Sequence, residues 1–199
     1  MFFLKDKQFI RFIIKFLVVF LLCYFGTLAV IGLTAPEGYY SKFISQYLDY
    51  VSWIKNSLIE GTRLLLSFFS IDTYRAPDFI VRIVNGRGVK IAMDCVGYGV
   101  MSFWIAYVTA SFAGFSKKIL WILAGIILIW IINVSRITLL LVALNKQWSM
   151  PLGLDHHTWF NVVAYIAIFI MIFFFERSIK TFKDVNSFKL NNIHDNNRD

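Results

Sequence analysis

The sequence predicts an all-α polytopic membrane protein with about four transmembrane helices, an outer-surface amphipathic helix and a small β-hairpin. The chain has 199 residues, of which 58% are hydrophobic and only 16% are charged, and its mean hydropathy is +0.66. Several stretches of about twenty residues carry almost no charge, and that length crosses ~30 Å of hydrocarbon. The net charge of +8 comes from lysine and arginine at the ends of these stretches, a pattern of membrane topology and not of a nucleic-acid partner.

Four apolar runs are long enough to span a bilayer, at residues 12–33, 96–115, 119–144 and 159–176. The first run starts basic, like a signal peptide, but it exceeds the usual length and has no clear cleavage site, so we expect a retained anchor. We expect one membrane-embedded domain over residues 1–179. The polar, Asn-rich residues 180–199 predict a disordered cytoplasmic tail.

Positive charges predict the orientation of these spans, because short cytoplasmic flanks gather lysine and arginine. Three basic groups flank the apolar runs: Lys5, Lys7 and Arg11; Lys117 and Lys118; and Arg177, Lys180 and Lys183. All three groups can lie inside only if the chain crosses the membrane four times. We therefore expect both termini in the cytoplasm, with residues 34–94 and 145–158 outside.

The outer segment 50–70 predicts an amphipathic helix that does not span. It carries Lys55, Asn56, Glu60 and Arg63, and a charge near the centre of a span costs roughly 2.5–3.5 kcal/mol.

Residues 79–93 predict a β-hairpin, because apolar residues alternate on both sides of Asn85-Gly86. A three-residue loop over residues 85–87 would place Phe79, Val81 and Ile83 opposite Met93, Ile91 and Val89. Arg82 and Lys90 would share the other face.

Cys95 is the first candidate for chemistry. It follows Asp94 at the start of an apolar run, so we expect it in the first turn of a helix, where the dipole favours a thiolate. The charge of Asp94 would oppose this thiolate unless it is paired. Gly97 and Gly99 would allow close approach of a neighbouring helix or a substrate backbone. A small buried hydrophobic residue is the alternative reading of Cys95; the other cysteine, Cys23, lies deep in the first run, and we expect no disulfide.

Arg136 is the second candidate, because it places a permanent charge well inside a predicted span, with Asn133 three residues earlier. The alternatives are an arginine that snorkels and one that pairs with Asp94 for structure.

The third candidate is the sequence DHHTWFN at residues 155–161, where His156 and His157 could hold or transfer the proton of a thiol. Adjacent helical residues point about 100° apart and seldom chelate together, so we expect no metal and no cofactor. The alternative is that these residues are polar only because they lie at the membrane interface. The topology, which was derived from lysine and arginine alone, places all three candidates toward the outer leaflet.

Three blocks of the sequence together resemble the exosortase and archaeosortase family of membrane-embedded cysteine transpeptidases. These blocks are A-M-D-C-V-G-Y-G at 92–99, N-V-S-R-I at 133–137 and H-T-W-F-N at 157–161. The resemblance covers roughly residues 78–176. Val96 departs from the Ser or Thr of many members, and the chain is short, without the further spans and soluble C-terminal domain of longer relatives.

The resemblance implies that Cys95 is the nucleophile, His157 the acid/base partner and Arg136 the third member of the site. The supporting residues would be Asp94, Gly97, Asn133, His156 and Asn161. It also implies a prokaryotic cell membrane and an extracytoplasmic site that cleaves exported proteins carrying a C-terminal motif, a transmembrane helix and a basic cluster. The acyl group would then pass to water, by hydrolysis, or to another acceptor, by transfer, and the sequence leaves both open. The alternative is a non-enzymatic assembly factor or small transporter with a structural intramembrane arginine.

Overall fold

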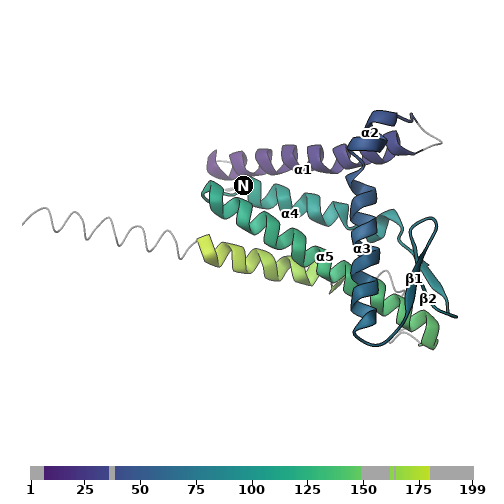
Figure 1. Cartoon of the computed structure of the whole chain (residues 1–199). Helices are drawn as coiled ribbons and strands as arrows, with labels where there is room; N and C mark the ends of the chain where they lie inside the picture. The colour runs from purple at the N-terminus through teal and green to yellow at the C-terminus, as the bar shows by residue number, and fades with distance from the viewer. Residues whose placement is uncertain (1–6, 36–38, 149–161, 164, 180–199) are drawn as a thin grey trace, which may run out of the picture.

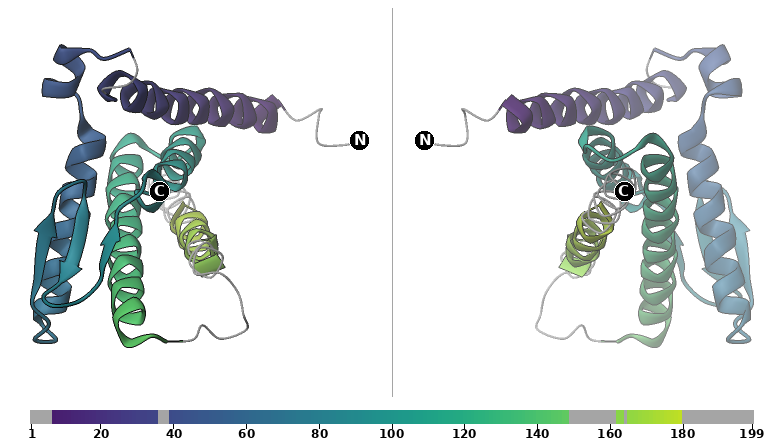
Figure 2. Two further views of the ribbon diagram at one scale, coloured as in Figure 1. Left: turned by 90° about the vertical axis from the view of Figure 1, so that its right-hand side faces the viewer. Right: turned by 90° about the vertical axis from the view of Figure 1, so that its left-hand side faces the viewer.

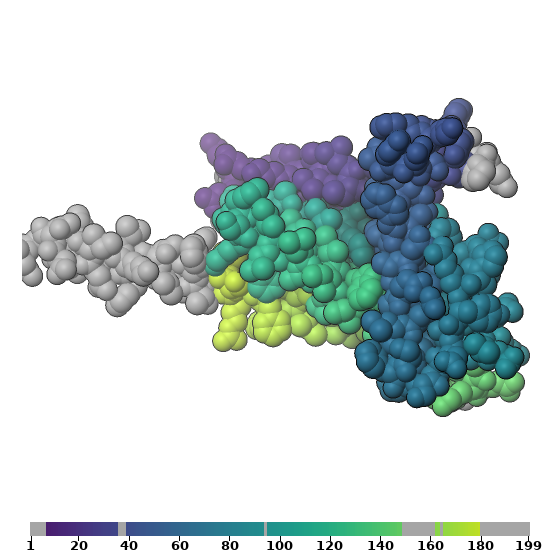
Figure 3. Space-filling view, in the orientation of Figure 1, coloured from purple at the N-terminus to yellow at the C-terminus, as the bar shows by residue number. Residues whose placement is uncertain are grey.

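The computed structural model describes residues 7–35, 39–148, 162–163 and 165–179. The described chain is mostly helical and has one small antiparallel sheet with the strand order β1-β2-β3. The long helices form a bundle, and helix α3 (Tyr50–Ser67) lies with the sheet at one end of it (Figure 1). A short helix α2 (Lys42–Tyr47), which the sequence did not predict, precedes α3. In Figure 3, α2, α3 and the strands form one continuous surface at this end of the bundle.

Within the described residues, two helices are long and apolar enough to cross a membrane, namely α1 (Lys7–Thr34) and α5 (Phe115–Lys146). Their exposed side chains include many Leu, Ile and Phe residues, such as Leu22 and Leu120. Large exposed apolar surfaces of this kind mark sites that contact either a membrane or a partner protein. Together these features support membrane association of the chain.

Helix α4 (Tyr98–Ala110) is shorter than the predicted span at residues 96–115. Its 13 residues extend about 20 Å, which is less than the ~30 Å of a hydrocarbon core. The prediction was wrong in these bounds because Gly97 adopts a left-handed conformation before the helix, and Gly114 is extended after it. The span expected at 159–176 begins outside the described residues, although residues 162–163 and 165–179 are helical. Four transmembrane helices therefore stay a prediction.

Helix α1 packs along α4 through an aromatic ladder. Phe12, Phe16, Phe20 and Tyr24 recur every four residues on one face of α1, the spacing that aligns side chains along a helix. Phe16 lies edge-on to Phe103 of α4, with ring centroids 5.4 Å apart. The same face brings Phe12 to Tyr107 and Tyr24 to Tyr98. The ladder fixes α1 against α4 while leaving most of its surface exposed.

The described members of the three basic groups gather at the end of the bundle opposite the sheet (Figure 1). Lys118 Nζ donates to the carbonyl of Thr109 at 2.7 Å, and Lys117 Nζ donates to that of Ser178 at 3.4 Å. The parity predicted from these charges, and the side of the membrane on which this end lies, stay predictions. Lys5, Lys180 and Lys183 lie outside the described residues.

Helix α3 confirms the predicted amphipathic helix, and it ends three residues earlier than expected. Asp49 caps its start by accepting from the backbone N–H of Ser52 at 3.0 Å. Its buried residues recur every three or four positions: Val51, Lys55, Leu58, Ile59, Thr62 and Leu66. This face packs against α5, and a Cβ on Gly61 would come within 2.8 Å of Trp130 and Val134. The absence of a side chain at Gly61 therefore permits the close crossing of α3 and α5.

The predicted hairpin forms, but its register differs by two residues. Strands β2 (Ile80–Ile83) and β3 (Gly88–Lys90) pair so that Val81 lies opposite Val89, and not opposite Ile91 as predicted. The turn is tightened by Asn85, at a φ of 59°, and by a hydrogen bond from Gly86 N to Ile83 O at 2.9 Å. A shift of two residues keeps every side chain on its face, so Val81 and Val89 are buried and Arg82 and Lys90 are exposed as expected.

Two further features of the sheet were not predicted. Strand β1 (Thr73–Ala76) adds a third strand beside β2, and Met93 belongs to a 3-10 turn instead of the hairpin. Asn145 at the end of α5 accepts from Arg87 N at 2.7 Å and donates to Arg87 O at 3.3 Å. This pair of bonds fastens the hairpin loop to α5.

The buried side chains form two clusters that follow one another along the length of α5. The cap core joins α3, the sheet and α5 through Leu58, Ile59, Leu66, Val81, Val89, Ile91, Cys95, Val134, Ile137 and Leu141. The bundle core joins α4, α5 and the helix over residues 165–179, called the last helix below. Its residues are Met101, Trp104, Val108, Ile129, Met171 and Phe175. Helix α5 runs between α3 and the last helix (Figure 2) and contributes to both clusters. The segment from Cys95 to Gly97 leads from one core to the other.

Candidate functional site

Cys95 closes a short 3-10 helix, η2 (Met93–Cys95), at the end of the sheet. Its backbone N–H donates to Ala92 O at 3.1 Å, and its side chain is only 5% exposed within the cap core. The prediction that Cys95 occupies the first turn of an α-helix was wrong, because α4 begins at Tyr98. Gly97, with a φ of 73°, separates the two helical segments. The dipole of α4 is therefore no argument for a thiolate at Cys95.

Asn133 of α5 holds this turn in place. Its Nδ2 donates to Val96 O at 3.2 Å, and the side chain is 7% exposed. A Cβ on Gly97 would lie 2.7 Å from the same Nδ2, so Asn133 occupies the space that a larger residue at position 97 would need. By contrast, a Cβ on Gly99 would meet only Tyr24, at an ordinary 3.7 Å. Close approach of a neighbouring helix is thus required at Gly97 and not at Gly99.

Arg136 lies on the buried face of α5, one turn beyond Asn133. It is 9% exposed, so the protein covers the side chain that the sequence alone placed within a span. Its neighbours Val134 and Ile137 pack in the cap core with Cys95. The structure therefore brings the elements that carry Cys95, Asn133 and Arg136 together. The side chain of Asp94 is not among those that the structure describes. A pair between Asp94 and Arg136 therefore stays an untested alternative.

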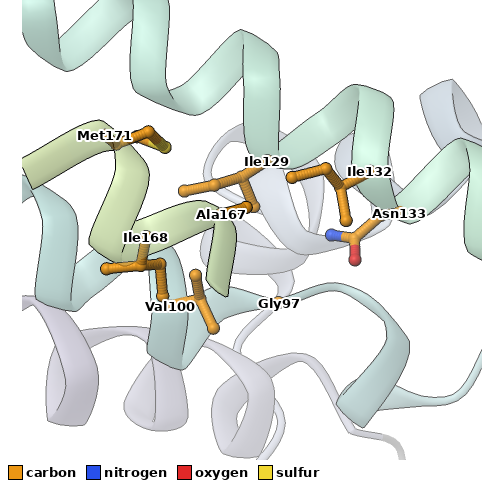
Figure 4. Close-up of a pocket in the computed structure, with 8 residues that line it drawn as sticks. All are labelled: Gly97, Val100, Ile129, Ile132, Asn133, Ala167, Ile168 and Met171. Carbon is orange, nitrogen blue, oxygen red and sulfur yellow. The ribbon is translucent and has the colours of Figure 1, made fainter. Parts of the chain in front are cut away.

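A small cavity of about 20 Å³ opens beside Gly97 and Asn133, which is room for one water molecule. Figure 4 shows the Asn133 amide directed toward this cavity from α5, with apolar side chains around it. The remaining lining comes from α4, α5 and the last helix: Val100, Ile129, Ile132, Ala167, Ile168 and Met171. Among the described residues of this lining, Asn133 is the only polar side chain.

A larger apolar groove of about 450 Å³ lies next to the cavity. Its lining comes from α1, α4 and the last helix: Phe20, Gly99, Val100, Phe103, Tyr165, Ile168, Phe169 and Ile172. Val100 and Ile168 line both spaces. An apolar surface between helices therefore continues to the position of Gly97 and Asn133.

His156, His157 and Asn161 lie outside the described residues, as does Asp155. The helix that follows them in the chain contributes Ile168 and Met171 to the small cavity. The last helix therefore packs at the same place as Gly97 and Asn133. Among the residues that the structure does describe, no group of three His, Cys, Asp or Glu side chains could hold a metal ion.

Lys55 is a residue that sequence reasoning interpreted only as an obstacle to spanning. It lies on the buried face of α3 and is 7% exposed, with its Nζ 4.8 Å from the centre of the Phe79 ring. Burial lowers the pKa of Lys55 below its usual value, while the charge of Asp49 opposes this effect. Its spacing from Val51, Leu58 and Ile59 was visible in the sequence and could have placed it on the apolar face.

The chain was also compared with known proteins. No protein-family model, curated protein or solved structure matches it.

Proposed function

We propose that this chain is a membrane-embedded cysteine protease or transpeptidase of the exosortase type, with Cys95 as the nucleophile. One observation carries the proposal: the turn that follows Cys95 is bonded to Asn133, 37 residues beyond Val96 in the chain and one turn from the buried Arg136. Two of the three sequence blocks that resemble the family therefore meet in space. The third block, with His157, precedes the helix that lines the same cavity.

The proposed site lies near the outer boundary of the bilayer. Asn133 is 18 residues from the start of α5 at Phe115, which is about 27 Å along the helix and close to the thickness of a hydrocarbon core. In this proposal the basic end of the bundle is cytoplasmic, and α3 and the sheet lie outside. The chain would then cross the membrane four times, with both termini inside.

The chemistry assigned to the site is acyl transfer. The Cys95 thiolate attacks a peptide carbonyl, forming a C–S bond, and Arg136 stabilises the oxyanion or holds the substrate. When the C–N bond breaks, His157 gives its proton to the leaving amine. It then takes a proton from the incoming water, hydroxyl or amine, which attacks the thioester and releases Cys95.

The proposed substrates are exported proteins that end in a short motif, a transmembrane helix and a basic cluster. The groove between α1, α4 and the last helix supports this choice, because it is apolar and shares Val100 and Ile168 with the cavity beside Gly97. A substrate helix in this groove would end at the level of the cysteine turn. Its basic cluster would lie at the other end of the bundle.

The test compares exported proteins from cells that carry the wild-type chain and cells that carry Cys95→Ala, Arg136→Ala or His157→Ala. Mass spectrometry of C-terminal peptides should show proteins that lose an apolar helix and basic cluster only in wild-type cells. Cys23→Ser is the matched control and should process normally. Normal processing in Cys95→Ala cells, with the variant present in the membrane, would rule the protease out.

The burial of Cys95 and Arg136 favours a second candidate, a non-enzymatic membrane assembly factor or small transporter in which both residues are structural. In that case Cys95→Ser would be silent, whereas Arg136→Ala would lower the amount of inserted protein. The same set of variants distinguishes the two candidates.

A further inference from the structure

Three cations form a row at the basic end of helix α1, which lies at the edge of the bundle (Figure 2). Lys7, Arg11 and Lys15 follow one another at intervals of four residues, so they share one face of the helix. All three are exposed, and within the described residues none of their side chains makes a hydrogen bond or an ion pair. Helix α1 contains no Asp or Glu. Because like charges four residues apart destabilise a helix, this row favours a negatively charged partner from outside the helix.

Membrane topology alone does not account for this arrangement. A basic flank needs its cations only near the end of a span, on any face of the helix. Lys15, however, lies eight residues beyond Lys7, about 12 Å along the helix, and falls inside the apolar run predicted at residues 12–33. Side chains on a helix lean toward its start, so Lys15 extends toward Arg11 and the level of the headgroups.

An open hollow of about 300 Å³ lies along the row of cations. Its lining consists of Lys7, Arg11 and Lys15 together with Ile10 and Ile14, which form a second row beside them. Neighbouring cations of the row are close enough to share the oxygens of one phosphate. The hollow therefore combines positive charge with adjacent apolar surface.

The apolar row continues from the hollow along α1. Val18 and Leu22 follow Ile14 at the same four-residue spacing, and these three side chains are 50%, 69% and 57% exposed, respectively. From Ile10 to Leu22 the row extends about 18 Å, slightly more than half of a ~30 Å hydrocarbon core. An acyl chain that begins at the hollow can follow this row into the bilayer, whereas a free phosphate ion would leave it uncovered.

We propose that the hollow binds an anionic phospholipid. The phosphate lies among Lys7, Arg11 and Lys15. One acyl chain follows the apolar row from Ile10 to Leu22. A headgroup with a net negative charge is preferred, because a zwitterionic headgroup carries a cation of its own that the row repels. This inference goes beyond the proposed function and rests on α1 as a membrane helix, so the outcome of substrate processing does not bear on it.

Native mass spectrometry of the full chain in detergent micelles tests the proposal. The chain is titrated with phosphatidylglycerol or with phosphatidylcholine of the same acyl chains. The wild-type chain should bind one phosphatidylglycerol about tenfold or more tightly than phosphatidylcholine. The variant Lys7→Gln/Arg11→Gln/Lys15→Gln should bind phosphatidylglycerol about a hundredfold more weakly, since each basic side chain near an anionic headgroup contributes about fivefold to the affinity.

The matched control Arg82→Gln/Arg87→Gln/Lys90→Gln removes the same charge from exposed positions of the sheet and its loop, and it should keep the wild-type affinity. Lys15→Gln alone should weaken binding about fivefold, and Lys15→Arg should keep the wild-type affinity. Glycerol phosphate, which has a phosphate but no acyl chain, should not displace the lipid at equal concentration. Equal affinities for the two lipids, an equal loss in the two triple variants, or displacement by glycerol phosphate would each overturn the proposal.

Discussion

Replacing Gly97 by alanine should disrupt the turn at Cys95 through two effects that can be separated. A non-glycine residue in the left-handed region costs about 1–2 kcal/mol, and Gly97 has a φ of 73°. The new Cβ would also lie 2.7 Å from Asn133 Nδ2, so the amide must move and lose its bond to Val96, worth about 0.5–1.5 kcal/mol. We expect Gly97→Ala to lower the free energy of unfolding by about 2–3 kcal/mol.

Gly99→Ala is the matched control, because position 99 is helical and a Cβ there meets only Tyr24 at 3.7 Å. Alanine should stabilise this position by up to about 0.5–1 kcal/mol. Chemical unfolding in detergent micelles, followed by tryptophan fluorescence, measures both variants. In the double variant Gly97→Ala/Asn133→Ala, the steric part of the penalty should disappear, so the two changes should be less than additive. Equal stability of Gly97→Ala and Gly99→Ala would contradict both effects.

Three other predictions concern the hairpin loop and helix α3. Asn145→Ala should release the hairpin loop and make the peptide bond after Arg87 sensitive to trypsin, which peptide mapping detects; unchanged resistance would contradict the bonds between these residues. Gly61→Ala should lower the free energy of unfolding by about 1–3 kcal/mol through overpacking, whereas Gly32→Ala, with nothing within 4 Å of its Cβ, should not. Burial lowers the pKa of Lys55 in the folded chain, so the unfolded chain keeps this proton up to a higher pH. The free-energy penalty for burying the charge is therefore complete below the lowered pKa. It disappears above the usual pKa of 10.5. The stability gained by Lys55→Met in unfolding experiments should therefore shrink as pH rises through this window, and a constant difference would contradict the assignment.

The sequence was sufficient for features that depend on local periodicity. The buried face of α3 follows from the spacing of Val51, Leu58 and Ile59, and the two faces of the hairpin follow from strict alternation. Basic residues at the ends of apolar runs predicted the parity of the spans, and this topology stays a prediction. These signals are contained within single elements, so no knowledge of distant contacts is needed.

Features that depend on distant contacts could not be derived in the same way. The hairpin register is fixed with the help of Asn145, which lies 58 residues beyond Arg87. The start of α4 depends on Gly97 and its contact with Asn133 from another helix. Lys55 was misjudged for a different reason: a lysine on an apolar face has the same sequence signature whether its charge reaches solvent or stays buried, as it does here.

The shortness of α4 has a consequence for biosynthesis in the proposed topology. Lipid offers no partner for a free backbone group, and the non-helical turn before α4 depends on Asn133 of α5 to satisfy the Val96 carbonyl. At 13 residues, α4 is also too short to be stable across a bilayer alone. The translocation machinery should therefore hold α4 until α5 has been synthesised, and release the two into the membrane as one helical pair.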